Sequence, residues 1–169
     1  KFDDPEIWKD NSVELFLNPS NDCKTYYQIL VNSQGSVSDQ SLVKIGTNSQ
    51  GDWTWNANAE TKVTPSEKGY RVEIAVPYQS LPGLKREEFR ANFARNRILK
   101  DLRQIETLYS WSPFIRGFHD LENFGTLGSS RQPLLINGDF SFEPSPRSAR
   151  HWGLWDDKHK WLEGWIGAE

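Results

Sequence analysis

Large aromatic side chains and hydrogen-bonding groups stand at the ends of several predicted strands in this sequence. The aromatic candidates are Trp8, Trp53, Trp55, Trp111 and Phe118. The hydrogen-bonding candidates at or near strand positions are Glu14, Gln28, Asn32, Arg95 and Arg97. Sugars present flat CH faces and many hydroxyls, which proteins bind with aromatic rings and with charged or amide groups. This set of side chains favours a carbohydrate site.

Most of these aromatics have an alternative role as core residues. Trp111 lies between two serines in a predicted strand, and tryptophan is highly buried on average, so the core is the better assignment for it. Trp8 lies in a polar turn beside Lys9 and Asp10. For Trp8, a ligand-stacking ring and a cover over the end of the core remain equally open.

Catalytic patterns are missing from the sequence. There is no GxSxG, P-loop, HExxH, CxxC or GxGxxG segment. His119, His151 and His159 lack metal-ligand spacing and are expected to be solvated loop residues. The carboxylates Asp3/Asp4 and Asp156/Asp157 are adjacent in turns, whereas glycoside hydrolysis needs two carboxyls across one bond. We therefore expect no catalytic site in this chain.

Composition narrows the class of protein. The chain has 169 residues, is 36% hydrophobic and 13% aromatic, and carries eight Trp. A net charge of −3 provides no footprint for nucleic acid, and no stretch is apolar enough to span a membrane. The single cysteine, Cys23, allows no intrachain disulfide. Methionine is absent even at position 1, which predicts a processed piece, an excised domain or a fragment.

Residue alternation predicts short antiparallel strands. In 12–17, Val13, Leu15 and Leu17 share one face and Ser12, Glu14 and Phe16 the other. Further strands are expected at 26–32, 41–45, 57–63, 70–76, 89–97, 108–111 and 123–127, with loops at 46–52 and 100–107 and a helical turn after Pro77. Turn residues separate them, and no long amphipathic helix is apparent. The pattern predicts an all-β fold, an antiparallel β-sandwich.

The composition changes near residue 128 and predicts a domain boundary. Residues 1–128 form the expected sandwich, and GSSRQP, about 129–133, is a linker. Residues 134–169 contain an NG turn and a Trp-rich tail with Trp152, Trp155, Trp161 and Trp165. This segment is too short to bury its own core, so it is interpreted as the beginning of a second module.

Five blocks of sequence resemble the family 9 carbohydrate-binding modules and their DOMON-like relatives. In chain order they are IWKDNSVELFLNP, YYQILVNSQG, GYRVEIAVPYQSL, FRANFARNR and YSWSPF…FHDLENFGTL. The resemblance covers about residues 5–128. It implies an immunoglobulin-like β-sandwich with one or two strands before the Trp8 block. Those strands are missing here, which predicts an open sheet edge.

The resemblance also implies site residues. In sugar-binding members two aromatics enclose a terminal sugar; they match Trp8 and Phe118 here. Glu14, Asn32 and Arg95 are expected as hydrogen-bond partners, whereas an arginine that some members place in the second block corresponds to about Leu30. Members often bind structural calcium, for which the candidate oxygen donors are Asp3, Asp4, Asp10 and Asp120, although ordinary turn use of these residues is the alternative.

The wider context follows from the same resemblance. The tail LLINGDFSFE…W resembles the start of a galactose-binding-like jelly-roll module. Together the two segments imply an extracellular or periplasmic multi-module protein whose catalytic domain, of the carbohydrate-active kind, lies elsewhere.

Three functions remain open from the sequence. The first is a non-catalytic module that stacks a sugar on Trp8 and Phe118. The second is a structural spacer without ligand. The third is a DOMON-type haem-binding module, which the lack of methionine disfavours because Met is a common axial ligand in such sites.

Overall fold

The protein is all-β in a computed structural model that describes residues 6–67, 69–99, 104–115, 117–128, 155–156 and 161–162. Besides strands, these residues contain three single 3₁₀ turns: η1 (Ile7–Lys9), η2 (Tyr78–Ser80) and η3 (Leu121–Asn123). The all-β prediction is confirmed. The helical turn expected after Pro77 is η2.

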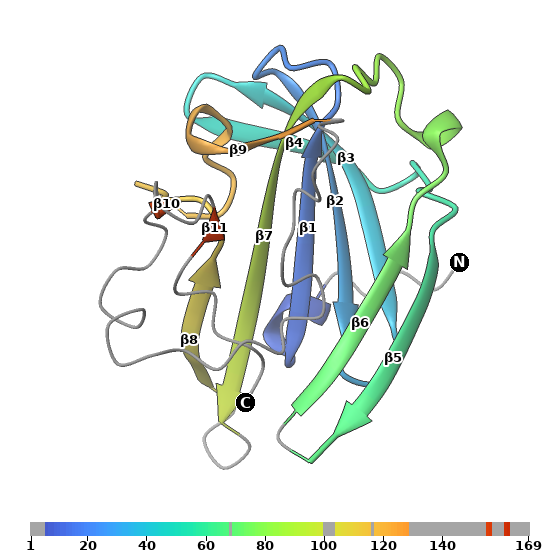
Figure 1. The fold of residues 1–169 in the computed structure, drawn as a ribbon, viewed down its shortest axis with the longest axis vertical. Coiled ribbons are helices and arrows are strands. Elements are labelled where there is room, and N and C mark those ends of the chain that lie inside the picture. Colours follow the sequence, from blue (N-terminus) through green and yellow to red (C-terminus); the bar gives the residue numbers. More distant parts are fainter. Residues whose placement is uncertain are drawn as a thin grey trace.

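One seven-stranded antiparallel sheet dominates the fold (Figure 1). Its strands lie in the order β4-β3-β2-β1-β7-β8, and β9 pairs with the other end of β7. Their bounds are β1 Ser12–Asn18, β2 Thr25–Asn32, β3 Val37–Ile45, β4 Asn48–Asp52, β7 Glu88–Leu99, β8 Gln104–Ser110 and β9 Gly125–Gly128. The strand at the centre, β1, is the strand with the clearest alternation in the sequence.

A second layer covers one face of this sheet. It is the antiparallel hairpin of β5 (Glu60–Ser66) and β6 (Gly69–Ala75), seen beside the large sheet in Figure 1. Between the layers lies a core around Ile29, Val31 and Ala57, packed by aliphatic side chains from both. The architecture is therefore a sandwich of unequal layers. Two further short strands, β10 (Trp155–Asp156) and β11 (Trp161–Leu162), pair with each other.

The sheet has two chemically different faces. Val13, Leu15, Ile29 and Phe93 belong to the packing face, which meets the β5–β6 hairpin. Glu14, Phe16, Gln28, Asn96 and their same-face neighbours form the pocket face. The split follows from alternation, because successive side chains in a strand point to opposite sides. The predicted division within β1 is what the register shows.

Four strands differ in presence or in starting residue from the sequence-based prediction. Residues 48–52 were expected as loop but form the edge strand β4, joined to β3 by a two-residue turn in which Gly46 has φ 61°. Glycine suits such a hairpin turn, and backbone pairing at an edge needs no apolar side chains. The third strand starts earlier, at Val37, and β8 starts at Gln104 inside the expected loop. Strand β5 begins at Glu60 rather than 57, because Asn58 takes a left-handed φ of 49°.

The segment after β8 returns over the pocket face and is fixed at both ends. At its start, Asn92 donates to Ser110 Oγ (2.8 Å) and accepts from the Ser112 amide (3.0 Å). At its end, the Trp111 ring lies against Gly125, where a Cβ would come within 2.2 Å of the indole. The segment buries Phe118, Leu121 and Phe124 over Phe16 and Tyr26. It thereby covers one half of the pocket face and leaves the other half open.

Candidate functional site

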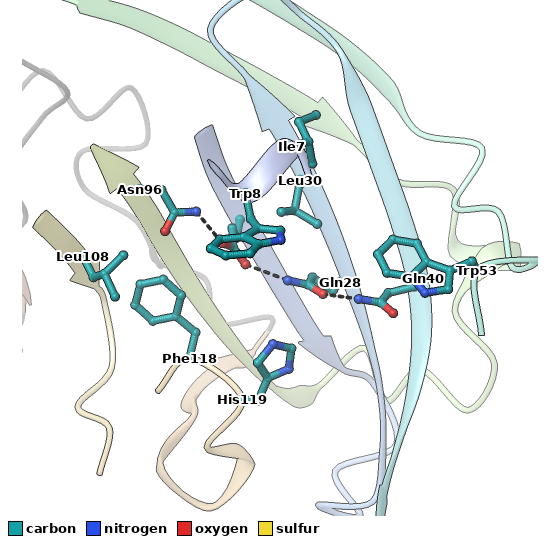
Figure 2. Close-up of a pocket in the computed structure, with 11 residues that line it drawn as sticks. Ile7, Trp8, Gln28, Leu30, Gln40, Trp53, Asn96, Leu108, Phe118 and His119 are labelled. Carbon is teal, nitrogen blue, oxygen red and sulfur yellow. Dashed lines mark hydrogen bonds between the residues drawn. The ribbon is translucent and has the colours of Figure 1, made fainter. Parts of the chain in front are cut away.

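A pocket of about 340 Å³ occupies the open half of the pocket face. Its floor is made by side chains of neighbouring strands, and its rim by η1, the turn after β4 and the segment after β8 (Figure 2). The lining residues are Ile7, Trp8, Glu14, Gln28, Leu30, Gln40, Trp53, Asn96, Leu108, Phe118 and His119. The pocket therefore combines aromatic rings with amide groups and one carboxylate.

Trp8 reaches the pocket because η1 is anchored by its neighbour. Ile7 is buried at 3% exposure, whereas Trp8 on the same short turn is 42% exposed. Figure 2 shows the Trp8 indole over the floor of the pocket. The buried residue fixes the turn and leaves an exposed ring at the lip, which is a suitable arrangement for stacking on a ligand.

Phe118 and His119 form the opposite wall. Phe118 is mostly buried, with its ring centroid 6.3 Å from that of Phe16 and 5.4 Å from that of Phe114. His119 Nδ1 shares a hydrogen bond of 2.8 Å with the Tyr26 hydroxyl. The accessible side of the imidazole faces the pocket, while its setting among apolar rings disfavours the charged form. This partial desolvation lowers the pKa of His119 and favours the neutral ring, although the residue as a whole is exposed.

A chain of amides converges on the buried carboxylate of Glu14. Asn96 Nδ2 donates to Glu14 Oε1 (2.5 Å), and Gln28 Nε2 donates to Glu14 Oε2 (2.6 Å). Gln40 Nε2 in turn donates to Gln28 Oε1 (2.6 Å). Figure 2 shows these bonds running across the floor of the pocket. Asn96 Nδ2 also donates to Ser12 Oγ (3.1 Å), and these acceptors fix the orientation of each amide.

Burial dominates the electrostatics of Glu14. The residue is 5% exposed, and burial raises the pKa of its carboxyl, although the hydrogen bonds from Asn96 and Gln28 oppose the rise. A carboxylate offers about four lone-pair sites, of which these amides use two. Glu14 therefore retains the capacity to accept hydrogen bonds from ligand hydroxyls.

Comparison with known families identifies the chain. The sequence profile of the carbohydrate family 9 binding domain-like family matches residues 1–128. The chain belongs to this family. The chain also resembles the solved structure of a candidate carbohydrate-binding protein from Bacteroides uniformis, at 22% sequence identity and a TM-score of 0.54. That likeness covers 75% of this chain but 64% of the other, and it supports the fold alone. No curated protein matches the chain.

Three of the predicted residues meet in this family 9-like pocket. Trp8, Glu14 and Phe118 are far apart in sequence, yet all line it. Leu30, at the position where some family members were noted to carry arginine, lines it as well and is 2% exposed. The pocket of this family member accordingly has an apolar patch where a guanidinium would have offered donors.

Asn32 lies outside the pocket. Its Oδ1 accepts from the amides of Gln34 (3.1 Å) and Ser36 (2.8 Å), and its Nδ2 donates to Asp10 Oδ2 (3.0 Å). These bonds close the turn between β2 and β3. The side chain that was expected to hold a sugar hydroxyl is thus committed to the turn.

Arg95 lies on the packing face, which corrects its expected place beside Glu14. In β7 it is one residue away from Asn96, so the two side chains point to opposite sides of the sheet. Its guanidinium carbon lies 5.9 Å from the centre of the Tyr109 ring, and its charge acts on Tyr70 of the second layer, where it opposes the rise in the pKa of Tyr70 that burial causes. Arg95 cannot contact a ligand in the pocket.

Of the four proposed calcium donors, the two that the structure describes, Asp10 and Asp120, serve as hydrogen-bond acceptors in turns. Asp10 Oδ2 accepts the hydrogen bond from Asn32 Nδ2, and Asp120 Oδ2 accepts one from the Ile115 amide at 2.9 Å. In the part of the chain that the structure describes, no three His, Cys, Asp or Glu side chains cluster as metal ligands. Asp3 and Asp4 lie outside the described residues. Asp10 and Asp120 are turn residues here.

Three pocket residues were missed as contributors. Gln40 and Asn96 were not singled out, and His119 was expected to be a solvated loop residue. Alternate residues of a strand point to the same face of the sheet. Applying this rule to the strands beside β1 could have identified Gln40 and Asn96 as residues on the same face as Glu14. His119 carries no such signal, because only the fold brings its loop against Tyr26.

None of the described helical turns has the length or apolarity to cross a membrane.

Proposed function

We propose that this protein is a non-catalytic carbohydrate-binding module that holds a sugar ring in the pocket between Trp8 and Phe118. The observation that carries the proposal is the meeting of these two rings over a buried carboxylate with its amide chain. Aromatic faces pack against sugar CH groups, and oriented amides and a carboxylate match sugar hydroxyls. Membership of the carbohydrate family 9 binding domain-like family supports the same reading.

The lining of the pocket supports binding rather than hydrolysis. Glycoside hydrolases place two carboxyls on either side of the scissile bond. Among the described residues that line the pocket, Glu14 is the one carboxyl group, and it is buried beneath the amides. The proposal further assigns the chain, on the strength of the family alone, to an extracellular or periplasmic protein that carries a carbohydrate-active domain elsewhere.

Calorimetric titration tests the proposed function. The protein is titrated with a panel of neutral oligosaccharides, with and without calcium, alongside the Trp8→Ala variant. We expect saturable heat with dissociation constants on the order of micromolar to millimolar, and loss of the heat in the variant. Tyr78→Ala is the matched control, because Tyr78 is an exposed aromatic outside the pocket lining.

The structural spacer is the competing outcome of this titration. If the folded protein, checked by circular dichroism, gives no heat with any saccharide, the sugar site is overturned. Equal affinity in the wild type and Trp8→Ala would instead move the sugar away from this pocket.

A further inference from the structure

The turn after β4 sends two neighbouring tryptophans to opposite faces of the sheet. Trp55 packs in the core against Tyr27, with ring centroids 4.6 Å apart. Trp53, two residues earlier, is 41% exposed and lines the pocket. Burial in the core accounts for Trp55. It does not account for Trp53, whose ring leaves a large apolar area in water beside a polar floor.

The turn that carries Trp53 is locked by its own hydrogen bonds. The Thr54 amide and hydroxyl both donate to Asp52 Oδ1, at 2.8 and 2.7 Å. These bonds fix the backbone that carries the indole. A backbone that is already ordered loses less conformational entropy when a ligand binds, so the turn favours binding at Trp53.

The pocket extends diagonally across the sheet, from Leu108 in β8 to Gln40 in β3 (Figure 2). In this sheet β7, β1 and β2 lie between those two strands. Neighbouring strands are roughly 4.8 Å apart, so the four spacings amount to about 19 Å. This span is longer than one sugar ring. Figure 2 shows Phe118 beside Leu108 at one end of the span and Trp8 near its middle, so lining remains on the Trp53 side for a further ring.

Gln40 supplies a fixed polar group on that side. Its Nε2 donates to Gln28 Oε1, and its own Oε1 lies so close to Gly51 that a Cβ there would approach within 2.1 Å. The amide is thus held from two directions. Its second N–H has no acceptor in the amide chain and is chemically suited to a hydroxyl.

We infer that Trp53 and Gln40 form a second sugar subsite, and that the protein binds oligosaccharides of more than one ring in preference to single sugars. The inference rests on the proposed function and specifies the ligand class of the same pocket. Trp53 is the distal stacking surface, and Gln40 the hydrogen-bonding group beside it. Neutral, hydroxyl-rich chains fit both, because neither residue carries a charge.

Chain-length dependence of binding tests the second subsite. The complete chain is titrated calorimetrically with glucose, xylose and their β-1,4-linked oligomers of two to five rings. The wild type should bind the oligomers of its preferred sugar several-fold, up to about tenfold, more tightly than the monomer, as expected for one further aromatic contact. Trp53→Ala should abolish this gain, so that the oligomers bind no more tightly than the monomer.

Two further variants keep the outcome interpretable. Trp53→Phe should retain most of the gain, because it keeps a ring at the same place. Trp8→Ala should weaken monomer and oligomer alike. Circular dichroism checks that each variant is folded.

Each alternative result overturns a distinct statement. A monomer that binds as tightly as its oligomers, or a Trp53→Ala variant that weakens both equally, overturns the second subsite and leaves the sugar pocket standing. Absence of binding by every saccharide, monomer included, overturns the proposed function and with it the subsite.

Discussion

The two faces of the large sheet bury their side chains by different means. On the packing face, Ile29 and Val31 lie in an aliphatic core beneath the β5–β6 hairpin. On the pocket face, Glu14, Gln28 and Asn96 are equally inaccessible but polar, and each is held by side-chain hydrogen bonds. Apolar burial stabilises a fold directly, whereas a buried polar group is tolerated only when its hydrogen bonds are made.

The packing face contributes mainly to the stability of the fold, whereas the pocket face is suited to binding a ligand. The packing face is mainly apolar and fits the second layer by complementary volume, although it also buries Arg95 and Asp39. The pocket face contains a carboxyl whose pKa burial raises, an arrangement that works against folding at neutral pH. Such a group is retained where it has a use, and here it lies at the floor of a pocket lined with aromatic rings.

The largest effect is expected from the packing face. Ile29→Ala removes a fully buried side chain between the layers and leaves a cavity. We expect a loss of about 2–5 kcal/mol in the free energy of unfolding, measured by urea denaturation, with sugar affinity of the folded fraction unchanged. Val43→Ala, an exposed aliphatic of the large sheet, is the control and should change stability by no more than about 0.5 kcal/mol.

On the pocket face, Glu14→Gln should have the opposite effect to Ile29→Ala: sugar affinity should fall while stability is kept. The substitution keeps the shape of the side chain and removes its charge. Sugar affinity should fall by roughly 1.5–3 kcal/mol, since a charged hydrogen-bond acceptor is lost, while stability at pH 7 stays equal or rises. A variant that is strongly destabilised yet binds normally would show that Glu14 serves the fold instead.

The pH dependence provides an independent check on Glu14. Because its pKa in the folded protein is raised above 4.5, the folded state holds the proton at pH values where the unfolded chain releases it. The resulting stabilisation is complete below pH 4.5 and is lost as pH rises through the raised pKa. Denaturation from pH 4 to 8 should therefore show the wild type declining relative to Glu14→Gln.

A smaller effect should come from Gly51, which touches the pocket only through Gln40. Gly51→Ala places a Cβ within 2.1 Å of Gln40 Oε1 and must displace that amide. Oligosaccharide affinity should fall a few-fold by calorimetry, because one neutral hydrogen bond contributes about 0.5–1.5 kcal/mol. Gln50→Ala, on the same exposed edge strand, should bind like the wild type.

The smallest effect is expected on the outer side of the second layer. Lys62 and Glu73 pair there at 4.0 Å, and both side chains are mostly in solvent. Lys62→Ala should change the unfolding free energy by less than about 1 kcal/mol and leave binding intact, as is usual for exposed ion pairs. A larger loss in thermal denaturation would mean that the hairpin contributes more through its surface than its packing suggests.

The alternation of side chains within single strands was readable from the sequence. Period-two patterns in 12–17 and 70–76 predicted which residues face the core, since parity along a strand is a local property. The edge strand β4 was missed because its residues are polar and its pairing is made by the backbone alone. Trp8 and Phe118 were identified as a pair through the family resemblance, which the spacing of the two residues by itself does not provide.

What the sequence by itself determined was the all-β class, the central strand β1 and the aromatic, hydrogen-bonding character of the site. Only the tertiary structure decided which of these groups meet. Pairing register joined Glu14 to Asn96, which the sequence did not single out, and put Arg95, which it did, on the far face. Register and loop placement depend on contacts between distant segments, so no local pattern encodes them.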